Sequence, residues 1–69
     1  MSARFKNAIF GVDWDLGVAS GWMDQRRKAL AAGNELEALQ SLLMAISAME
    51  SAELALAAAR QAAKKGGSR

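Results

Sequence analysis

The sequence predicts an all-α fold, a hairpin of two antiparallel helices that dimerises into a four-helix bundle. Proline is absent and alanine and leucine dominate, so intrinsic propensity favours helix along most of the 69 residues. Gly33 and Asn34 interrupt this pattern near the middle, where a turn between two helices is expected. A seven-residue rhythm of small residues runs along the second half, which is typical of close packing between helices.

Residues 1–12 are predicted to form a short amphipathic segment. Phe5 and Ile9 lie four residues apart, as on one face of a helical turn, and Phe10 follows directly. This segment either folds back onto the hairpin or continues straight into the first helix.

The first helix is predicted over residues 13–32, with Asp13 as its N-cap. Arg26, Arg27 and Lys28 lie near its C-terminus, where positive charge is favourable. Two neighbouring apolar stripes are expected on it, the first formed by Trp14, Val18 and Trp22 and the second by Leu16, Ala19, Met23 and Leu30.

A turn is predicted at residues 33–34 and a second helix over residues 35–65. Gly33 suits the left-handed residue that follows a helix, and Asn34 with Glu37 forms a capping-box pattern. Gly66 is expected to end the helix, which leaves residues 66–69 as a disordered tail.

The second helix is expected to carry two faces, one bulky and one small. The bulky face holds Leu36, Leu39, Leu42, Leu43, Ile46, Met49 and Leu56. The small face holds Ala38, Ser41, Ala45, Ala48, Ala52, Ala55, Ala59 and Ala62, with alternating spacings of three and four. A predicted first helix of 20 residues is too short to cover both faces, so a second copy is expected to cover the remainder. The alternative is that these alanines reflect helix propensity alone.

Small surfaces are expected to meet small surfaces, either within one chain or between two copies. The residues assigned to self-association are Gly17, Gly21, Ala45, Ala48, Ala52, Ala55 and Ala59.

The composition argues against catalysis and against bound metals or cofactors. Cysteine and histidine are absent, which removes disulfides, thiolate ligands and the usual general base. Glu50 and Glu53 lack the histidine of di-iron bundles, and the segment starting at Asp13 has its glycine one position too early for a calcium loop. We expect a non-enzymatic protein with no catalytic, cofactor or metal residues.

The longest uncharged run, residues 38–49, is shorter than the ~20 residues of a membrane-spanning helix. We therefore expect no transmembrane segment, and the absence of cysteine fits a cytoplasmic location.

The expected function is protein–protein interaction, as an adaptor or inhibitor of a larger cytoplasmic protein, of the kind phages encode as antagonists of host proteins. Large aromatic and basic side chains are the candidate contacts, because they dominate binding hot spots. They are Phe5, Phe10, Trp14, Trp22, Arg26, Arg27 and Lys28.

Two alternatives remain open. Nucleic-acid binding would use Arg26, Arg27, Lys28 and the basic C-terminus, but Glu35 and Glu37 at the start of the second helix would repel phosphate. Binding to a membrane surface would use Phe5, Ile9, Phe10 and Trp14.

Overall fold

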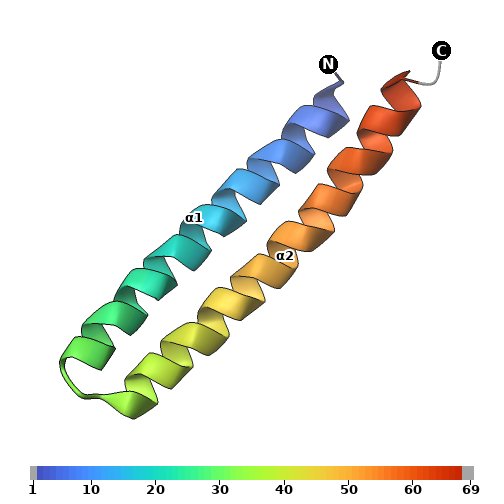
Figure 1. Ribbon diagram of the computed structural model, residues 1–69. Helices are drawn as coiled ribbons and strands as arrows, with labels where there is room; N and C mark the ends of the chain where they lie inside the picture. The colour runs from blue at the N-terminus through green and yellow to red at the C-terminus, as the bar shows by residue number, and fades with distance from the viewer. Residues whose placement is uncertain (1, 68–69) are drawn as a thin grey trace.

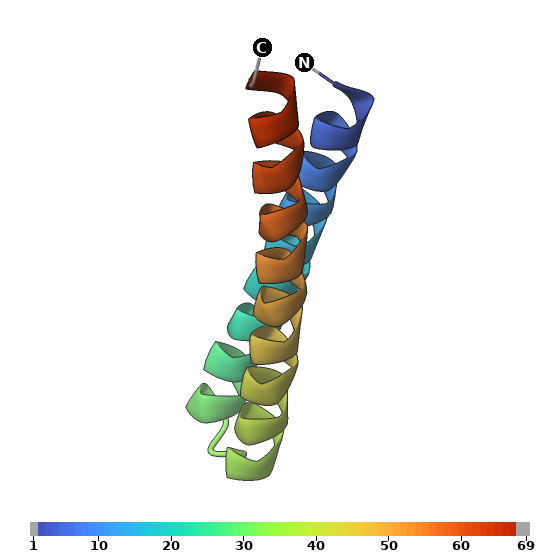
Figure 2. The ribbon, with the colours of Figure 1, turned by 90° about the vertical axis from the view of Figure 1, so that its right-hand side faces the viewer.

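The computed structural model describes residues 2–67, with the side chains of residues 2–64, and contains two helices. Helix α1 spans Ala3–Ala31 and helix α2 spans Glu35–Gly67. They run antiparallel and side by side along most of their length, with the turn at one end and both ends of the described chain at the other (Figure 1). Figure 2 shows that they cross at a shallow angle, in a rod with Cα extents of 56 × 13 × 10 Å. The prediction of an all-α helical hairpin is confirmed.

Helix α1 begins at Ala3 rather than at Asp13, so the boundary predicted at residue 13 is wrong. Ser2 is the N-cap: its backbone is extended and its Oγ accepts a hydrogen bond from the Phe5 N–H at 3.1 Å. Residues 3–12 contain no proline and form the first turns of α1 instead of a separate segment. Helix α1 is therefore long enough to accompany α2 along most of its length.

The turn has the capping geometry that the sequence predicts. Gly33 has a φ of 75°, a left-handed conformation that glycine adopts without strain. The Gly33 N–H donates to the Leu30 carbonyl and the Asn34 N–H donates to the Ala29 carbonyl, which together form a Schellman motif. Asn34 Oδ1 accepts from the Glu37 N–H at 3.1 Å, and Asn34 Nδ2 donates to Glu37 Oε2. Asn34 therefore helps to end α1 and also caps α2.

Helix α2 continues to Gly67, so the prediction that Gly66 ends it is wrong. A glycine in a final turn costs about 1 kcal/mol relative to alanine, which weakens a helix without stopping it. Residues 68 and 69 of the predicted tail lie outside the described residues.

The buried seam between the helices is formed by small side chains. The predicted small face of α2 is its inward face, with Ala38, Ser41, Ala45, Ala52, Ala59 and Ala62 buried and Ala48 and Ala55 half-buried. The facing positions of α1 follow the same rhythm: Phe5, Ala8, Val12, Asp15, Ala19, Trp22, Arg26 and Ala29. Among the described residues only alanines and Ser41 are buried, so the hairpin has a thin core.

Candidate interaction surfaces

The hairpin leaves one broad apolar side uncovered, which we call the apolar face. Its rows repeat every seven residues beside the seam and so lie on one side of each helix. On each helix, the residues of a row come directly after every second residue of the seam. Because the helices are antiparallel, rows at equivalent positions on the two helices lie on the same side of the seam. The face comprises Ile9, Leu16, Met23 and Leu30 of α1 and Leu39, Leu42, Ile46, Met49 and Leu56 of α2.

The exposure of these side chains shows that the seam shields them only in part. Leu42, Met49 and Leu56, next to the seam, are 38–40% exposed, and Leu39 farther out is 55% exposed. Leu36 and Leu43 of the predicted bulky face are also exposed. The bulky face of α2 therefore stays open, although α1 is longer than predicted.

Two of the aromatic candidates form an exposed pair on the outside of α1. The rings of Phe10 and Trp14 stack with their centroids 6.5 Å apart. Their residues are 69% and 65% exposed, so they pack mainly on each other. Val18 is exposed as well, so only Trp22 of the predicted stripe of Trp14, Val18 and Trp22 lies on the inward face of α1. Phe5 is half-buried at the open end.

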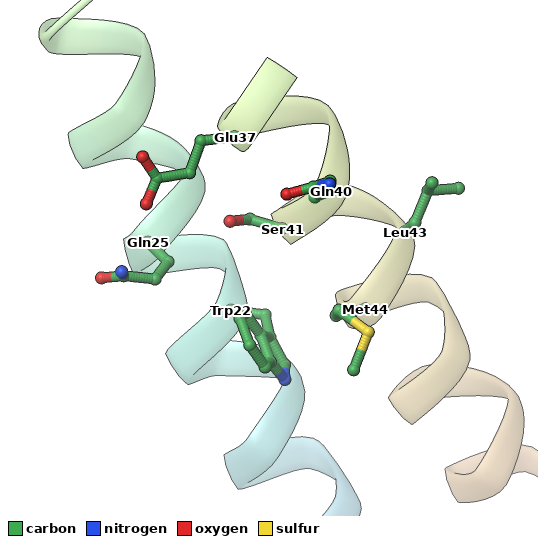
Figure 3. A pocket seen from close by; sticks show the side chains of 7 residues that line it. All are labelled: Trp22, Gln25, Glu37, Gln40, Ser41, Leu43 and Met44. Carbon is green, nitrogen blue, oxygen red and sulfur yellow. The ribbon is translucent and has the colours of Figure 1, made fainter. Parts of the chain in front are cut away.

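Trp22 is half-buried and lines an open groove of about 420 Å³ on the side of the hairpin away from the apolar face. Figure 3 shows its indole close to α1, with the side chain of Met44 on the neighbouring α2. The other lining residues are Gln25, Glu37, Gln40, Ser41 and Leu43. The groove exists because a large indole faces small residues, which hold the helices close together but cannot fill the space beside it.

The predicted basic cluster is divided between two environments. Arg26 occupies a seam position, half-buried, and its Nε is buried without a hydrogen-bond partner among the described residues. Arg27 is exposed and forms a 2.9 Å ion pair with Asp24 three residues before it. Lys28 is exposed. Arg27 and Lys28 are therefore more accessible to a partner than Arg26.

The residues assigned to self-association have two different locations. A Cβ on Gly17 or Gly21 would meet nothing within 4 Å, so neither glycine lies in the seam. Ala45, Ala52 and Ala59 are buried and Ala48 and Ala55 half-buried against α1 of the same chain. Within this hairpin the small surfaces thus meet between α1 and α2.

Charge is segregated along the rod. At the open end the described side chains carry only positive charge, on Arg4, Lys6, Arg60 and Lys64. Towards the middle the charged side chains are the acidic Asp13, Asp15, Glu50 and Glu53. No group of three or more possible metal ligands gathers among the described residues.

Helix α2 is apolar, although little of it is buried. Between residues 35 and 64 it contains an 18-residue window with a hydropathy of 1.5, of which 17% is buried. By length and composition it passes the minimum for crossing a membrane, a test that core helices of soluble proteins also pass. The expectation of no transmembrane segment stays a prediction.

The fold and its surfaces are those of a two-helix hairpin protein with a small-residue seam and an open apolar face. Comparison of the chain with protein-family models, curated proteins and solved structures finds no match.

Proposed function

We propose that this protein is a non-enzymatic interaction module. It pairs with a second copy through the apolar face and binds a larger protein through residues outside that face. The observation that carries the proposal is the contrast between a seam of buried alanines and large apolar residues such as Leu39 and Leu16 that are at least half exposed. Contiguous exposed apolar surface of this size marks interaction sites, because its burial releases about 25 cal/mol per Å².

A four-helix bundle is the assembly that such a hairpin favours. Each helix already uses one heptad seam against its neighbour, and the apolar face supplies a second seam on both helices. Two hairpins stacked face to face bury both copies of the second seam at once.

The pair of Phe10 and Trp14 remains exposed in such a bundle, because both residues lie outside the apolar face. Large aromatic side chains with little conformational freedom are favoured anchors for a protein target. The exposed Arg27 and Lys28 add positive charge that attracts an acidic surface. This combination suits an adaptor or inhibitor of a larger cytoplasmic protein.

Sedimentation equilibrium tests the self-association. We expect a dimer, with a melting temperature that rises with protein concentration because folding and association are coupled. Ile46→Glu, midway along the apolar face of α2, should dissociate the dimer. The matched variant Met44→Glu, exposed on the groove side, should leave it intact. A monomer whose melting temperature is independent of concentration would refute the proposal.

Association with a membrane is the second candidate, favoured by the hydropathy of α2 and the positive charge of the open end. The two tryptophans report on it directly. A blue shift of their fluorescence with anionic vesicles, absent with neutral vesicles, would support this candidate, and an unchanged spectrum would reject it.

A further inference from the structure

We infer that the two copies pack with their turns at opposite ends of the bundle. This inference rests on the proposed self-association and specifies its geometry. For hairpins that stack face to face with aligned helices, two arrangements have two-fold symmetry: turns at the same end or turns at opposite ends. The charges beside the apolar face distinguish them.

One row of residues on each helix lies at the outer edge of the apolar face, four residues from the apolar residues next to the seam. On α1 this row is Lys6, Asp13, Ser20 and Arg27, and on α2 it is Leu39, Ile46, Glu53 and Arg60. The outer rows of two stacked hairpins meet at the edge of the bundle, so their charges interact across the dimer interface.

The antiparallel packing fixes which residues lie at the same level. Gly11 of α1 lies opposite Ala55 of α2, with 3.6 Å between a Cβ built on Gly11 and the Cβ of Ala55. Counting outwards from this pair, Lys6 lies level with Arg60 and Asp13 lies level with Glu53.

Turns at the same end would bring like charges together. The two-fold axis then runs along the rod, so α1 packs on α2 of the partner and residues of equal level meet. Lys6 would face Arg60 of the partner, and Asp13 would face Glu53 of the partner. The two-fold symmetry repeats each of these like-charge contacts. It also keeps residues of equal level opposite each other, so the two copies cannot slide along the rod to separate the charges. Like charges placed directly opposite each other disfavour an interface.

Turns at opposite ends bring unlike charges together. The two-fold axis then crosses the rod, so α1 packs on α1 of the partner in the opposite direction. Full overlap of the apolar face centres the axis near Ser20, midway between Ile9 and Leu30. Asp13 and Arg27 each lie seven residues from Ser20, so Asp13 of each copy meets Arg27 of the other. Arg27 keeps Asp24 as a neighbour within its own helix.

The ends of the rod are also complementary in this arrangement. The basic open end of one copy, with Lys6 and Arg60, lies beside the turn of the other, where Glu35 begins α2 on the side of the apolar face. On α2 the centre is Ile46, and Glu53 lies level with Leu39 of the partner at the solvated edge. The charge pattern thus favours the opposite-end arrangement both at Asp13 and at the ends of the rod.

The area of the apolar face is sufficient for a stable dimer only if the faces of the two copies overlap fully. From Ile9 to Leu30 it extends for about 32 Å of helix, and two helices side by side are about 20 Å wide. Two such faces bury roughly 1,300 Å², near the lower limit for a stable protein interface. A dimer shifted by half the face would fall well below that limit, so the centred position is the one expected.

Distances between spin labels test the arrangement on the full chain, which has no natural cysteine. Single variants Asn7→Cys and Ser20→Cys, each exposed, carry the label near the open end and at the predicted axis. Turns at opposite ends predict a short distance at residue 20 and about 40 Å at residue 7, from 26 residues of helical rise. Equal distances at both positions, as expected when the two α1 helices lie diagonally across the bundle with their turns at the same end, would overturn the arrangement and leave the proposed function standing if the chain sediments as a dimer. Absence of any distance, with a monomer in sedimentation, would refute both.

The sign of a charge reversal gives an independent readout. Asp13→Lys should weaken the dimer about fivefold with turns at opposite ends, because it places a lysine beside Arg27 of the partner. It should strengthen the dimer with turns at the same end, because it removes the repulsion by Glu53 of the partner. Gln25→Lys, on the groove side, should leave the dissociation constant unchanged. A tighter Asp13→Lys dimer would overturn the inference.

Discussion

At the scale of single residues, the glycines of this chain differ in what they contribute. Gly33 holds a left-handed backbone conformation that ends α1, whereas Gly17 and Gly21 lie inside α1 with open space where a Cβ would be. A side chain is therefore unfavourable at the first position and free of steric cost at the other two.

We expect opposite effects from the same substitution. Gly33→Ala should lower the free energy of unfolding by about 1 kcal/mol, because alanine is strained at positive φ. Gly17→Ala should raise it by up to about 1 kcal/mol through helix propensity. Urea denaturation at one protein concentration measures both. A destabilising Gly17→Ala would indicate that a second copy approaches this glycine closely, as the sequence-based assignment of Gly17 to self-association requires.

The two tryptophans also invite a direct comparison. Trp14→Ala should change the free energy of unfolding by less than about 0.5 kcal/mol, because Trp14 is 65% exposed. Trp22→Ala should cost about 1–2 kcal/mol, because Trp22 is half-buried against α2. Thermal unfolding followed by circular dichroism measures the difference, and equal losses would contradict the assignment of Trp14 to partner contact.

The caps show where local sequence suffices for prediction. Gly33, Asn34 and Glu37 were predictable because their contacts lie within a few residues of each other. The start of α1 was not, because both Ser2 and Asp13 are competent caps. The choice between them depends on whether residues 3–12 find support along the end of α2, which is a tertiary effect.

At the scale of the helices, the two inward faces were predictable to different degrees. The seam of α2 is uniform, and its spacing alone identifies it. The seam of α1 includes the charged residues Asp15 and Arg26, so a search for stripes of apolar residues does not identify it. Extending the seven-residue rhythm of α2 to α1 would have found these positions.

The seam should be sensitive to added volume. Ala52→Leu should destabilise the hairpin by about 1–3 kcal/mol, because residue 52 is 6% exposed and α1 leaves no room for a larger side chain. Ala57→Leu adds the same atoms at an exposed position of α2 and should be nearly neutral. Denaturant midpoints of the two variants decide the matter. Equal midpoints would mean that the seam is not a tight contact.

At the scale of the whole molecule, the chain resembles half of a bundle. The all-α hairpin followed from helix propensity and a single turn signal, both of which are local properties of the sequence. The complete apolar face did not follow from local properties. It combines residues from two helices, and the packing of the helices decides which of their residues lie side by side. The larger protein that we propose as a target is not identified by this sequence, because recognition depends equally on the surface of the target.

Salt concentration should modulate the assembly. If Asp13 and Arg27 of two copies pair as proposed, raising ionic strength from low to physiological should weaken the dimer modestly, since exposed pairs are screened beyond about 8 Å. Sedimentation of the unaltered chain across a salt series measures this. Dimerisation that strengthens steadily with salt at low ionic strength would indicate net repulsion between the copies.

The hairpin brings the beginning and the end of the described chain to one pole of a rod 56 Å long (Figure 1). In a bundle with turns at opposite ends, these poles point away from each other. The assembly would then act as a spacer, because segments joined to the described chain ends of one copy would be held a rod's length away from those joined to the other.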